Sequence, residues 1–459
     1  MAETDTSVKV RLLTFNTWGL KYVSKFRKER LRAIADKLAG NSKAVALSGA
    51  DRLKAGTANG HSDDSSDCIE TDEYDVVALQ EVWCQEDWDY IVDTCKTAYP
   101  YYRLFYSGIL AGPGLAILSK IPIESTFLYR FPINGRPSAF FRGDWYVGKS
   151  ISVTLLKPVD SHSSPLAILN SHMHAPYALT GDAAYHCHRS CQAWDFSKLA
   201  NLYKKAGYAV VIVGDLNSRP GSLPHKFLTM ETGLVDSWEQ LHGQQDLQYI
   251  ARLSPMEQIR HGGTTCDSIL NTWRAMRRPD EACRLDYALV DPARLQTVAA
   301  SVRFTERIPD VGSFSDHFAY SCTLRLLPRD EQCAVGDGDR DRDRDLLLGK
   351  FANYEEMLGV IAHYNGTARW QRLWRGSHFW LSVVLIVAVH IVITFTSNRA
   401  SWSSIFWVFF AVFLAVTGLV DGMISFLFGR SELRALEEVA QEVQDAKKDV
   451  QSALSRGKV

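Results

Sequence analysis

Residues 210–220 read Val-Val-Ile-Val-Gly-Asp-Leu-Asn-Ser-Arg-Pro, and this stretch decides how the rest of the chain is interpreted. Its four apolar, mostly β-branched residues predict a buried strand. In this interpretation Gly214 ends the strand, and the Arg-Pro-Gly that follows predicts a turn. Asp215 and Asn217 are then expected where a core strand opens into a loop, a rigid position suited to catalytic groups. Taken alone, the stretch favours the simpler interpretation, an Asp/Asn turn that closes a strand, and the rest of the chain decides against it.

Composition excludes some classes of function. The chain has 459 residues, with 51 basic and 52 acidic side chains and a formal net charge of −1. Nucleic-acid-binding proteins carry a basic field that this balance lacks, so we expect no nucleic-acid partner. The nine cysteines follow no framework spacing and residues 1–10 show no signal peptide, which predicts free thiols in a reducing compartment. Cys187, His188 and Cys191 lack a second ligand pair at zinc-site spacing, so we interpret them as incidental residues of a helix.

Short apolar runs alternate with helical patterns through residues 1–328. The expected strands are 8–15, 74–79, 115–118, 151–156, 167–169, 210–213, 285–290 and 320–326, and the expected helices are 26–38, 88–98 and 199–206. This order predicts an α/β catalytic domain, a four-layer sandwich of two β-sheets flanked by helices. Residues 40–73 are rich in Gly, Ala, Ser and Asp without any period, and we predict a disordered insertion there.

The rest of the chain predicts a membrane anchor. A charged linker at 329–345 and a juxtamembrane segment at 346–376 precede two apolar segments, 377–397 and 401–428. Each segment is about long enough to cross a hydrocarbon layer of roughly 30 Å, and the short turn between them predicts a transmembrane hairpin.

Basic residues outside the hairpin predict its orientation. Arg369, Arg372 and Arg375 precede it and Arg430 and Arg434 follow it, whereas its turn holds only Arg399. The positive-inside rule then predicts a two-span integral membrane protein with a cytoplasmic catalytic domain, for which we expect the endoplasmic reticulum or mitochondrial membrane.

The tail at 431–459 carries apolar residues at alternating three- and four-residue steps, which predicts a short coiled coil or docking stripe. These residues are Leu433, Leu436, Ala440, Val443, Val450 and Leu454. Gly418 and Gly422 form a small-xxx-small pattern typical of close helix contact. A homodimer formed through the hairpin and tail is one arrangement that these patterns allow.

Polar residues recur at the ends of the predicted strands, and their order is more specific than any one of them. The series is Phe15-Asn16-Thr17, Leu79-Gln80-Glu81-Val82, Ser171-His172, Gly214-Asp215-Leu216-Asn217, Leu285-Asp286-Tyr287 and Ser315-Asp316-His317. It resembles the endonuclease/exonuclease/phosphatase superfamily, to which pancreatic deoxyribonuclease and abasic-site endonucleases belong. The resemblance covers residues 8 to about 327 and implies a deoxyribonuclease-like fold and phosphodiester hydrolysis.

The resemblance also implies a role for each polar residue. Glu81, Asn16 and Asp316 would hold Mg²⁺, with Mn²⁺ as a substitute, because hard cations prefer oxygen ligands. His317 would be the general base, and Asp286 would fix its tautomer. Asp215 would orient the attacking water. Asn217 and His172 would hold phosphoryl oxygens as charge develops.

Residues 143–150, Gly-Asp-Trp-Tyr-Val-Gly-Lys-Ser, match a nucleotide-binding P-loop. That loop must be followed by a helix, and 150–156 is rich in strand-forming residues instead, so we expect no ATP binding. The segment, together with 134–137 and 174–177, resembles the membrane-anchored neutral sphingomyelinases and fungal inositol phosphosphingolipid phospholipases C. That resemblance places Asp144 and Lys149 in a mobile segment that arranges the active site when anionic phospholipid binds. A weak surface salt bridge between them is the alternative.

The expected activity is that of a Mg²⁺-dependent phospholipase C. Water attacks the phosphorus of a membrane inositol phosphosphingolipid and releases ceramide and a phosphorylated head group. Anionic phospholipids are the expected activators. The alternatives are the sphingomyelin specificity of the animal enzymes, a nuclease built on the same core residues, and a non-catalytic membrane adaptor.

Overall fold

The computed structural model describes residues 8–40, 73–110, 112–139, 142–328 and 340–456. The insertion predicted at 40–73 and residues 329–339 of the predicted linker fall almost wholly outside them. The chain divides into two compact units. The first comprises Met1–Phe131, Tyr146–Ala175 and Gln192–Gly338, and the second comprises Pro132–Trp145, Pro176–Cys191 and Asp339–Val459.

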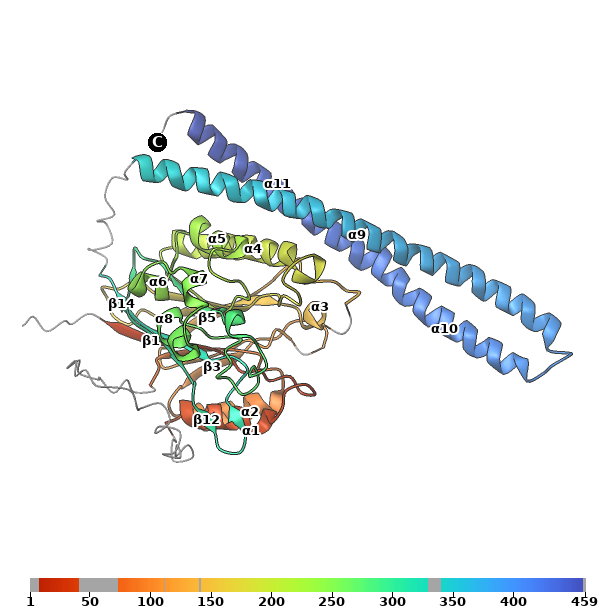
Figure 1. Ribbon diagram of the computed structural model, residues 1–459, viewed down its shortest axis with the longest axis horizontal. Helices are drawn as coiled ribbons and strands as arrows, with labels where there is room; N and C mark the ends of the chain where they lie inside the picture. The colour runs from red at the N-terminus through yellow and green to blue at the C-terminus, as the bar shows by residue number, and fades with distance from the viewer. Residues whose placement is uncertain (1–7, 41–72, 111, 140–141, 329–339, 457–459) are drawn as a thin grey trace, which may run out of the picture. The chain divides into compact units, whose positions relative to one another are not determined.

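Two mixed sheets of six strands each form the first unit (Figure 1). One has the order β11 (Leu295–Arg303), β14 (Ala319–Leu326), β1 (Lys9–Asn16), β2 (Val76–Gln80), β4 (Ala116–Ser119) and β3 (Tyr101–Leu104). The other has the order β5 (Ile123–Arg130), β6 (Ser150–Leu156), β7 (Leu166–His172), β8 (Ala209–Asp215), β10 (Asp286–Val290) and β9 (Val235–Asp236). A separate hairpin joins β12 (Arg307–Ile308) to β13 (Gly312–Ser313).

Most central strands of both sheets are apolar on both faces, which explains the nearly continuous apolar runs in the sequence. The inner faces share one core that includes Leu12, Val76, Ile168, Val211 and Ala288. The outer face of the first sheet packs on α1 (Arg27–Leu38) and α2 (Gln85–Cys95). The four-layer α/β prediction is therefore confirmed.

The remaining helices of the first unit are short, apart from the part of α4 (His186–Lys205) that lies in it. They are α5 (Leu223–Lys226), α6 (Ser237–His242), α7 (Leu247–Ile250) and α8 (Pro255–Gly262). Helix α4 begins well before the predicted 199–206, and Cys187, His188 and Cys191 lie on it as expected.

The prediction that Gly214 ends its strand is wrong. Strand β8 continues to Asp215, and Gly214 lies inside it with a φ of 130°. A side chain there would collide with β7, because a Cβ atom would lie 1.9 Å from the Ser171 carbonyl oxygen. Glycine thus allows β7 and β8 to stay paired as far as His172 and Asp215.

Helices α9 (Arg340–Thr396), α10 (Ser403–Met423) and α11 (Gly429–Ser455) dominate the second unit, and a π-helical turn, Ile424–Phe428, joins the last two. Helix α9 starts inside the predicted linker. It includes the predicted juxtamembrane segment and nearly all of the first predicted span. Residues 340–345 of the predicted linker are therefore helical.

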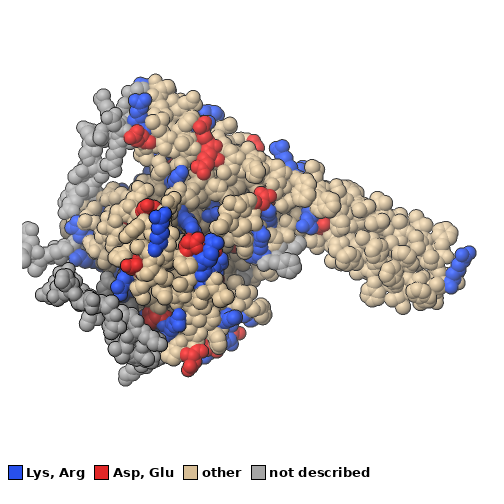
Figure 2. Space-filling model, in the orientation of Figure 1, with Lys and Arg blue, Asp and Glu red and all other residues tan. Residues whose placement is uncertain are grey.

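Two continuous helical stretches, Asp343–Thr396 and Ser403–Ser455, each contain a segment that is long and apolar enough to cross a membrane. Their apolar part is mostly exposed and forms an arm almost without charged side chains (Figure 2). Gly418 packs on Ser382 and Gly422 on Phe379, as the small-residue pattern predicts. Arg375 pairs with Asp421 at 2.5 Å. The pair compensates a charge that would be costly within a bilayer.

The stripe on the tail has its partner in the same chain. Leu436, Val443 and Val450 are buried on α11, which packs along α9. Lys447, which interrupts the stripe, pairs with Glu355 at 3.0 Å. The docking-stripe prediction is thus satisfied by α9.

A partly buried polar group, called here the Arg136 cluster, joins the segments 132–145 and 176–191 of the second unit to its helices. It consists of Arg136, Asp182, His188, Tyr364 and Glu432. Arg136 donates to the Tyr364 hydroxyl (3.1 Å) and to the Asp182 carbonyl (2.9 Å). Tyr364 donates to Glu432 (2.7 Å), whose carboxylate lies 3.4 Å from His188.

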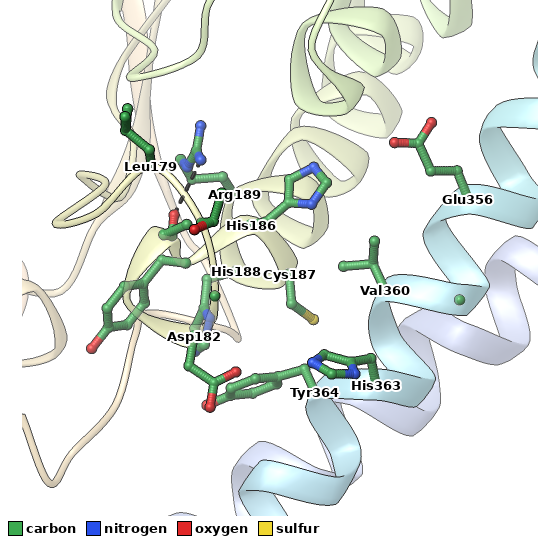
Figure 3. A pocket seen from close by; sticks show the side chains of 15 residues that line it. Leu179, Asp182, His186, Cys187, His188, Arg189, Glu356, Val360, His363 and Tyr364 are labelled. Atoms are coloured by element: carbon green, nitrogen blue, oxygen red, sulfur yellow. Dashed lines mark hydrogen bonds between the residues drawn. The ribbon is translucent and has the colours of Figure 1, made fainter.

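Beside this cluster lies a cavity of about 550 Å³ between the start of α4 and α9 (Figure 3). Its lining includes His186, Arg189, Glu356 and His363. The ring of His188 packs on Tyr185 and Tyr364, with centroids 4.9 and 4.6 Å apart. His188 is thus part of the packing of the second unit.

Candidate active site

The register of the second sheet places its strand-end residues directly opposite one another on neighbouring strands. His172 pairs with Asp215 across β7 and β8, and Asp215 pairs with Asp286 across β8 and β10. The first sheet contributes Asn16 at the end of β1 and Glu81 directly after β2. Asp316 and His317 come from the loop that enters β14. Separate chain segments thus deliver polar groups to one edge of the sandwich.

Asn16 links the two sheets. Its amide nitrogen donates to Glu81 Oε1 and to Asp215 Oδ2, both at 3.0 Å. Its amide oxygen accepts from the backbone N–H of Trp18 (3.0 Å). One side chain therefore sets the spacing of two buried carboxylates from different sheets.

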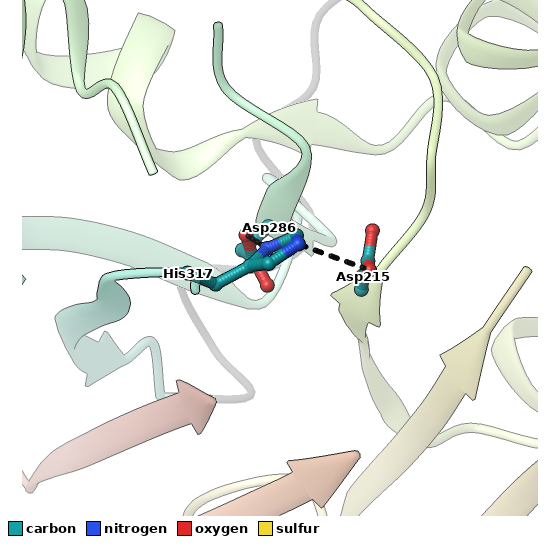
Figure 4. Close-up of side chains that lie close together, drawn as sticks. All are labelled: Asp215, Asp286 and His317. Carbon is teal, nitrogen blue, oxygen red and sulfur yellow. Dashed lines mark hydrogen bonds and ion pairs between the residues drawn. The ribbon is translucent and has the colours of Figure 1, made fainter. Parts of the chain in front are cut away.

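His317 is arranged as a base with an orienting carboxylate (Figure 4). Its Nδ1 lies 2.9 Å from Asp286 Oδ2, and its Nε2 lies 3.8 Å from Asp215 Oδ2. Burial alone would lower the pKa of His317, but Cys266, Asp286 and Asp215 together raise it well above its ordinary value. The Asp286 contact fixes the tautomer that leaves Nε2 facing the site.

The carboxylates of the site are poorly compensated. Burial raises the pKa of Glu81, and the neighbouring Asp316 raises it further. Burial also raises the pKa of Asp215, to about 7. The Oδ1 atom of Asp286 has no hydrogen-bond partner among the described residues. Buried acidic oxygens at this density suit a hard divalent cation, so the residues present fit a metal site.

One group of potential ligands is defined by geometry within the described part of the chain. Asp215, Asp286 and His317 each offer an atom within 4.8 Å of the others. The predicted metal residues are Asn16, Glu81 and Asp316, and of these Asn16 and Glu81 are in direct contact. Asp316 influences Glu81 through its charge, while its Oδ2 binds Arg274 at 2.6 Å. The two groups meet at Asp215, which Asn16 contacts.

Two site residues occupy left-handed backbone, which non-glycine residues seldom adopt. Glu81 has a φ of 60° and Asn217 a φ of 47°. The backbone N–H of Asn217 donates to Asp215 Oδ1 (3.0 Å), and its amide donates to the Met173 carbonyl (3.0 Å). The fold holds these strained positions in the way typical of functional sites.

His172 lies between the two carboxylates that Asn16 joins. Its Nε2 is 3.5 Å from Asp215 Oδ2 and 3.8 Å from Glu81 Oε1. Burial lowers the pKa of His172 well below its ordinary value, and the positive charge of Lys149 lowers it further. Lys149 also acts on Glu81 and Asp215 through its charge. The structure therefore brings Lys149, itself buried, into the electrostatics of the site.

Asp144 belongs to the second unit, where it accepts a hydrogen bond of 2.6 Å from the Tyr177 hydroxyl. It opens the short helix α3 (Asp144–Val147). Strand β6 follows at Ser150, as the sequence predicts, whereas a P-loop continues into a helix.

Two residues that contact the site carry no signal in the sequence. The Sγ atom of Cys266 lies 3.5 Å from His317 Nε2, and Arg274 binds Asp316. Both lie between α8 and β10, where no strand pattern marks the chain. Ser315, which donates to the Asn16 carbonyl at 2.6 Å, belongs to the Ser-Asp-His motif, and its position there is the signal for its role.

Comparison with known proteins places this site in a family. The yeast inositol phosphosphingolipids phospholipase C of Saccharomyces cerevisiae is 62% identical over 99% of this chain and 94% of its own length. The protein of the same name from Schizosaccharomyces pombe is 34% identical over 96% and 95%. Human sphingomyelin phosphodiesterase 2 is 30% identical, over 50% of this chain and 46% of its own length. The Endonuclease/Exonuclease/phosphatase family matches residues 13–317, and the chain belongs to that family.

Proposed function

We propose that this chain is a metal-dependent phospholipase C that hydrolyses inositol phosphosphingolipids to ceramide and a phosphorylated head group. The observation that carries the proposal is the 62% identity with the yeast phospholipase C along almost the full length of both chains. The buried acid–histidine site supplies the residues that a phosphodiester hydrolase needs. Sphingomyelin is the second candidate substrate, supported by the sphingomyelin phosphodiesterases that match about half of the chain.

His317 would remove a proton from the attacking water through Nε2, while Asp286 holds the imidazole in position. Asp215, 3.8 Å from that nitrogen, would accept a hydrogen bond from the other O–H of the water and so aim its oxygen at phosphorus. The P–O bond to ceramide then breaks, the ceramide alkoxide takes up a proton from solvent water, and His317 returns to solvent the proton that it took from the attacking water. Removing the base should cost the bulk of the rate.

Oxygen ligands from Glu81, Asn16 and Asp316 would hold the cation, for which we propose Mg²⁺ with Mn²⁺ as a substitute. When bound, it would supply positive charge that polarises the phosphodiester and lowers the pKa of His317 towards neutrality. His172 and Asn217 would donate hydrogen bonds to phosphoryl oxygens. His172 suits this role because burial keeps its ring neutral, with an N–H to donate.

Lys149 would add positive charge at the phosphate, and Asp144 would set the position of the segment that carries it. Anionic phospholipids are the activators we propose for this arrangement. Two observations support this proposal. Residues 143–150 resemble the corresponding segment of the membrane-anchored family, and Asp144 and Lys149 both lie in this one short segment.

The apolar hairpin of α9 and α10 would anchor the enzyme as a two-span membrane protein. The arginines on both flanks support a cytoplasmic catalytic domain. We propose the endoplasmic reticulum or mitochondrial membrane as its location. Dimerisation would use the exposed faces of the hairpin, because the buried stripe of α11 is occupied by α9.

The test is a direct assay of head-group release. Purified full-length protein would be given inositol phosphosphingolipid, sphingomyelin or DNA, each with Mg²⁺ or with a chelator. We expect Mg²⁺-dependent release from inositol phosphosphingolipid, slower release from sphingomyelin and intact DNA. Faster cleavage of sphingomyelin would reassign the head group, and cleavage of DNA alone would refute the phospholipase proposal.

A further inference from the structure

Two loops beside Glu81 expose large apolar side chains. In residues 105–110, Ile109 is 68% exposed and Leu110 is 76% exposed. In residues 17–26, Tyr22 is 91% exposed and Val23 is 67% exposed. We call these four side chains the apolar rim. Single exposed apolar residues are common and need no explanation, whereas exposed apolar residues that gather around a site are typical of an interaction surface.

The loop 17–26 is fixed directly to Glu81, and Gly114, which follows the loop 105–110 in the chain, lies against Glu81. The backbone N–H of Gly19 donates to the Glu81 carbonyl (3.1 Å), and the N–H of Val82 donates to the Gly114 carbonyl (3.0 Å). Gly114 lies so close that a Cβ atom there would be 3.1 Å from Glu81 Cα. The rim therefore lies at the edge of the sandwich that carries the site.

The first of these loops is also tied to the segment that carries Lys149. Ile109 donates from its backbone N–H to the Tyr146 carbonyl at 2.8 Å. Gly108 and Gly148 pack against each other so closely that a Cβ atom on Gly148 would lie 2.6 Å from Gly108 Cα. The exposed tip at Ile109 and Leu110 therefore lies in direct contact with the segment 146–150.

The tip is braced in its exposed position. The Tyr106 hydroxyl donates to Gln85 (3.2 Å), and a cavity of about 290 Å³ lined by Val82, Phe105 and Ile109 lies beneath the loop. Ile109 and Leu110 both line this cavity, and their side chains nevertheless remain mostly exposed. Burying two such side chains outside water is favourable in proportion to their apolar area.

We propose that the apolar rim enters the surface of the bilayer that holds the substrate, and so brings the site onto single lipid molecules. This inference rests on the proposed function, because a lipid substrate requires the site to face a membrane. The chain also carries its own apolar helical hairpin, which gives the protein a bilayer to act on. Contact at Ile109 would be transmitted through Tyr146 to Lys149.

Depth-dependent fluorescence quenching tests the contact without an activity assay. A single-cysteine label would be introduced by Ile109→Cys in full-length protein in vesicles, in a background where every cysteine outside the buried core is serine. The matched control is Leu202→Cys on α4, because Leu202 is 62% exposed, close to the 68% of Ile109. Leu202 precedes β8 in the chain, and β8 itself spans roughly 20 Å between Ala209 and Asp215.

We expect lipids with a quencher high on the acyl chain to quench the label at 109 at least threefold more than the label at 202. Equal quenching at both positions would overturn the proposal. Failure of the proposed function gives a different result, since head-group release would then be absent in wild-type protein while the label at 109 remains quenched.

A kinetic experiment tests whether contact of the apolar rim with the bilayer promotes turnover of membrane substrate. Ile109→Asp combined with Leu110→Asp should lower the ratio of turnover on vesicles to turnover on a water-soluble short-chain substrate at least tenfold. Leu202→Asp should leave that ratio unchanged. A double variant with an unchanged ratio would show that the rim does not contact the bilayer.

Discussion

The strand-end site of the first unit and the Arg136 cluster of the second unit are both buried and polar, but their charges are balanced differently. In the Arg136 cluster, burial alone would lower the pKa of Arg136, yet Tyr364, Tyr185 and Asp182 hold it above its ordinary value. In the site, burial raises the pKa of both Glu81 and Asp215. The charge of Arg136 is therefore compensated within its cluster, whereas the buried carboxylates of the site are only partly compensated and fit a divalent cation.

The largest effect should come from the base. His317→Ala should reduce head-group release by about 10²–10⁴-fold, because no other described group stands at that position to take the proton. His225→Asn is a matched control, as it changes another buried histidine of the first unit and should alter the rate less than about twofold. Circular dichroism would confirm that both variants fold. Near-normal activity of His317→Ala would refute the assignment of the base.

A pH titration extends the comparison to His225, whose Nε2 has no hydrogen-bond partner among the described residues. Burial lowers its pKa from 6.5 to about 4. The folded state binds the proton less tightly than the unfolded state, so the contribution to stability is complete above pH 6.5 and is lost as pH falls towards 4. The loss should be about 3 kcal/mol, at about 1.36 kcal/mol per pKa unit.

His225→Asn isolates this contribution. Its amide oxygen can still accept from the Gly221 N–H, which lies 3.3 Å from His225 Nδ1, but it does not titrate. Denaturant unfolding between pH 7 and pH 4 should show the wild type losing stability relative to the variant as the pH falls. A constant difference over that range would contradict the prediction.

Metal addition should distinguish the two clusters directly. At about 100 times its dissociation constant, Mg²⁺ should stabilise the first unit by about 2.7 kcal/mol relative to protein in chelator. Glu81→Gln should lose this stabilisation, measured by thermal unfolding, because it removes a ligand charge. Tyr364→Phe, in the Arg136 cluster, should retain it. Full Mg²⁺ stabilisation of Glu81→Gln would show that the cation binds elsewhere.

The smallest effect should come from the satisfied cluster. Tyr364→Phe removes the hydroxyl that donates to Glu432 and accepts from Arg136, at a cost of about 1–3 kcal/mol. Hydrogen exchange in 176–191 should accelerate accordingly. Tyr249→Phe, at an exposed position, should change nothing. Unaltered exchange in Tyr364→Phe would show that the cluster does not hold this loop.

Strand patterns predict most of the first unit because its central strands are buried on both faces and form apolar runs. The strand patterns end β8 too early, because a glycine in sequence usually indicates the end of a strand. The need for glycine at position 214 comes from its close approach to Ser171, which only the structure shows. The composition of residues 329–345 predicts a charged linker, whereas in the structure helix α9 already starts at Arg340. Among site residues, Cys266 and Arg274 could not be predicted, because nothing in their local sequence marks the contacts they make.

The sequence by itself determined which residues stand at the strand ends, because strand length and turn chemistry are local, and it determined the apolar hairpin for the same reason. Only the tertiary structure decided how those strand ends meet. Asn16 joins Glu81 to Asp215, which is 199 residues from Asn16, and His317 reaches Asp286 through the loop before β14. The pKa shifts of these groups arise from burial and from neighbours on other strands, which exist only once both sheets have packed.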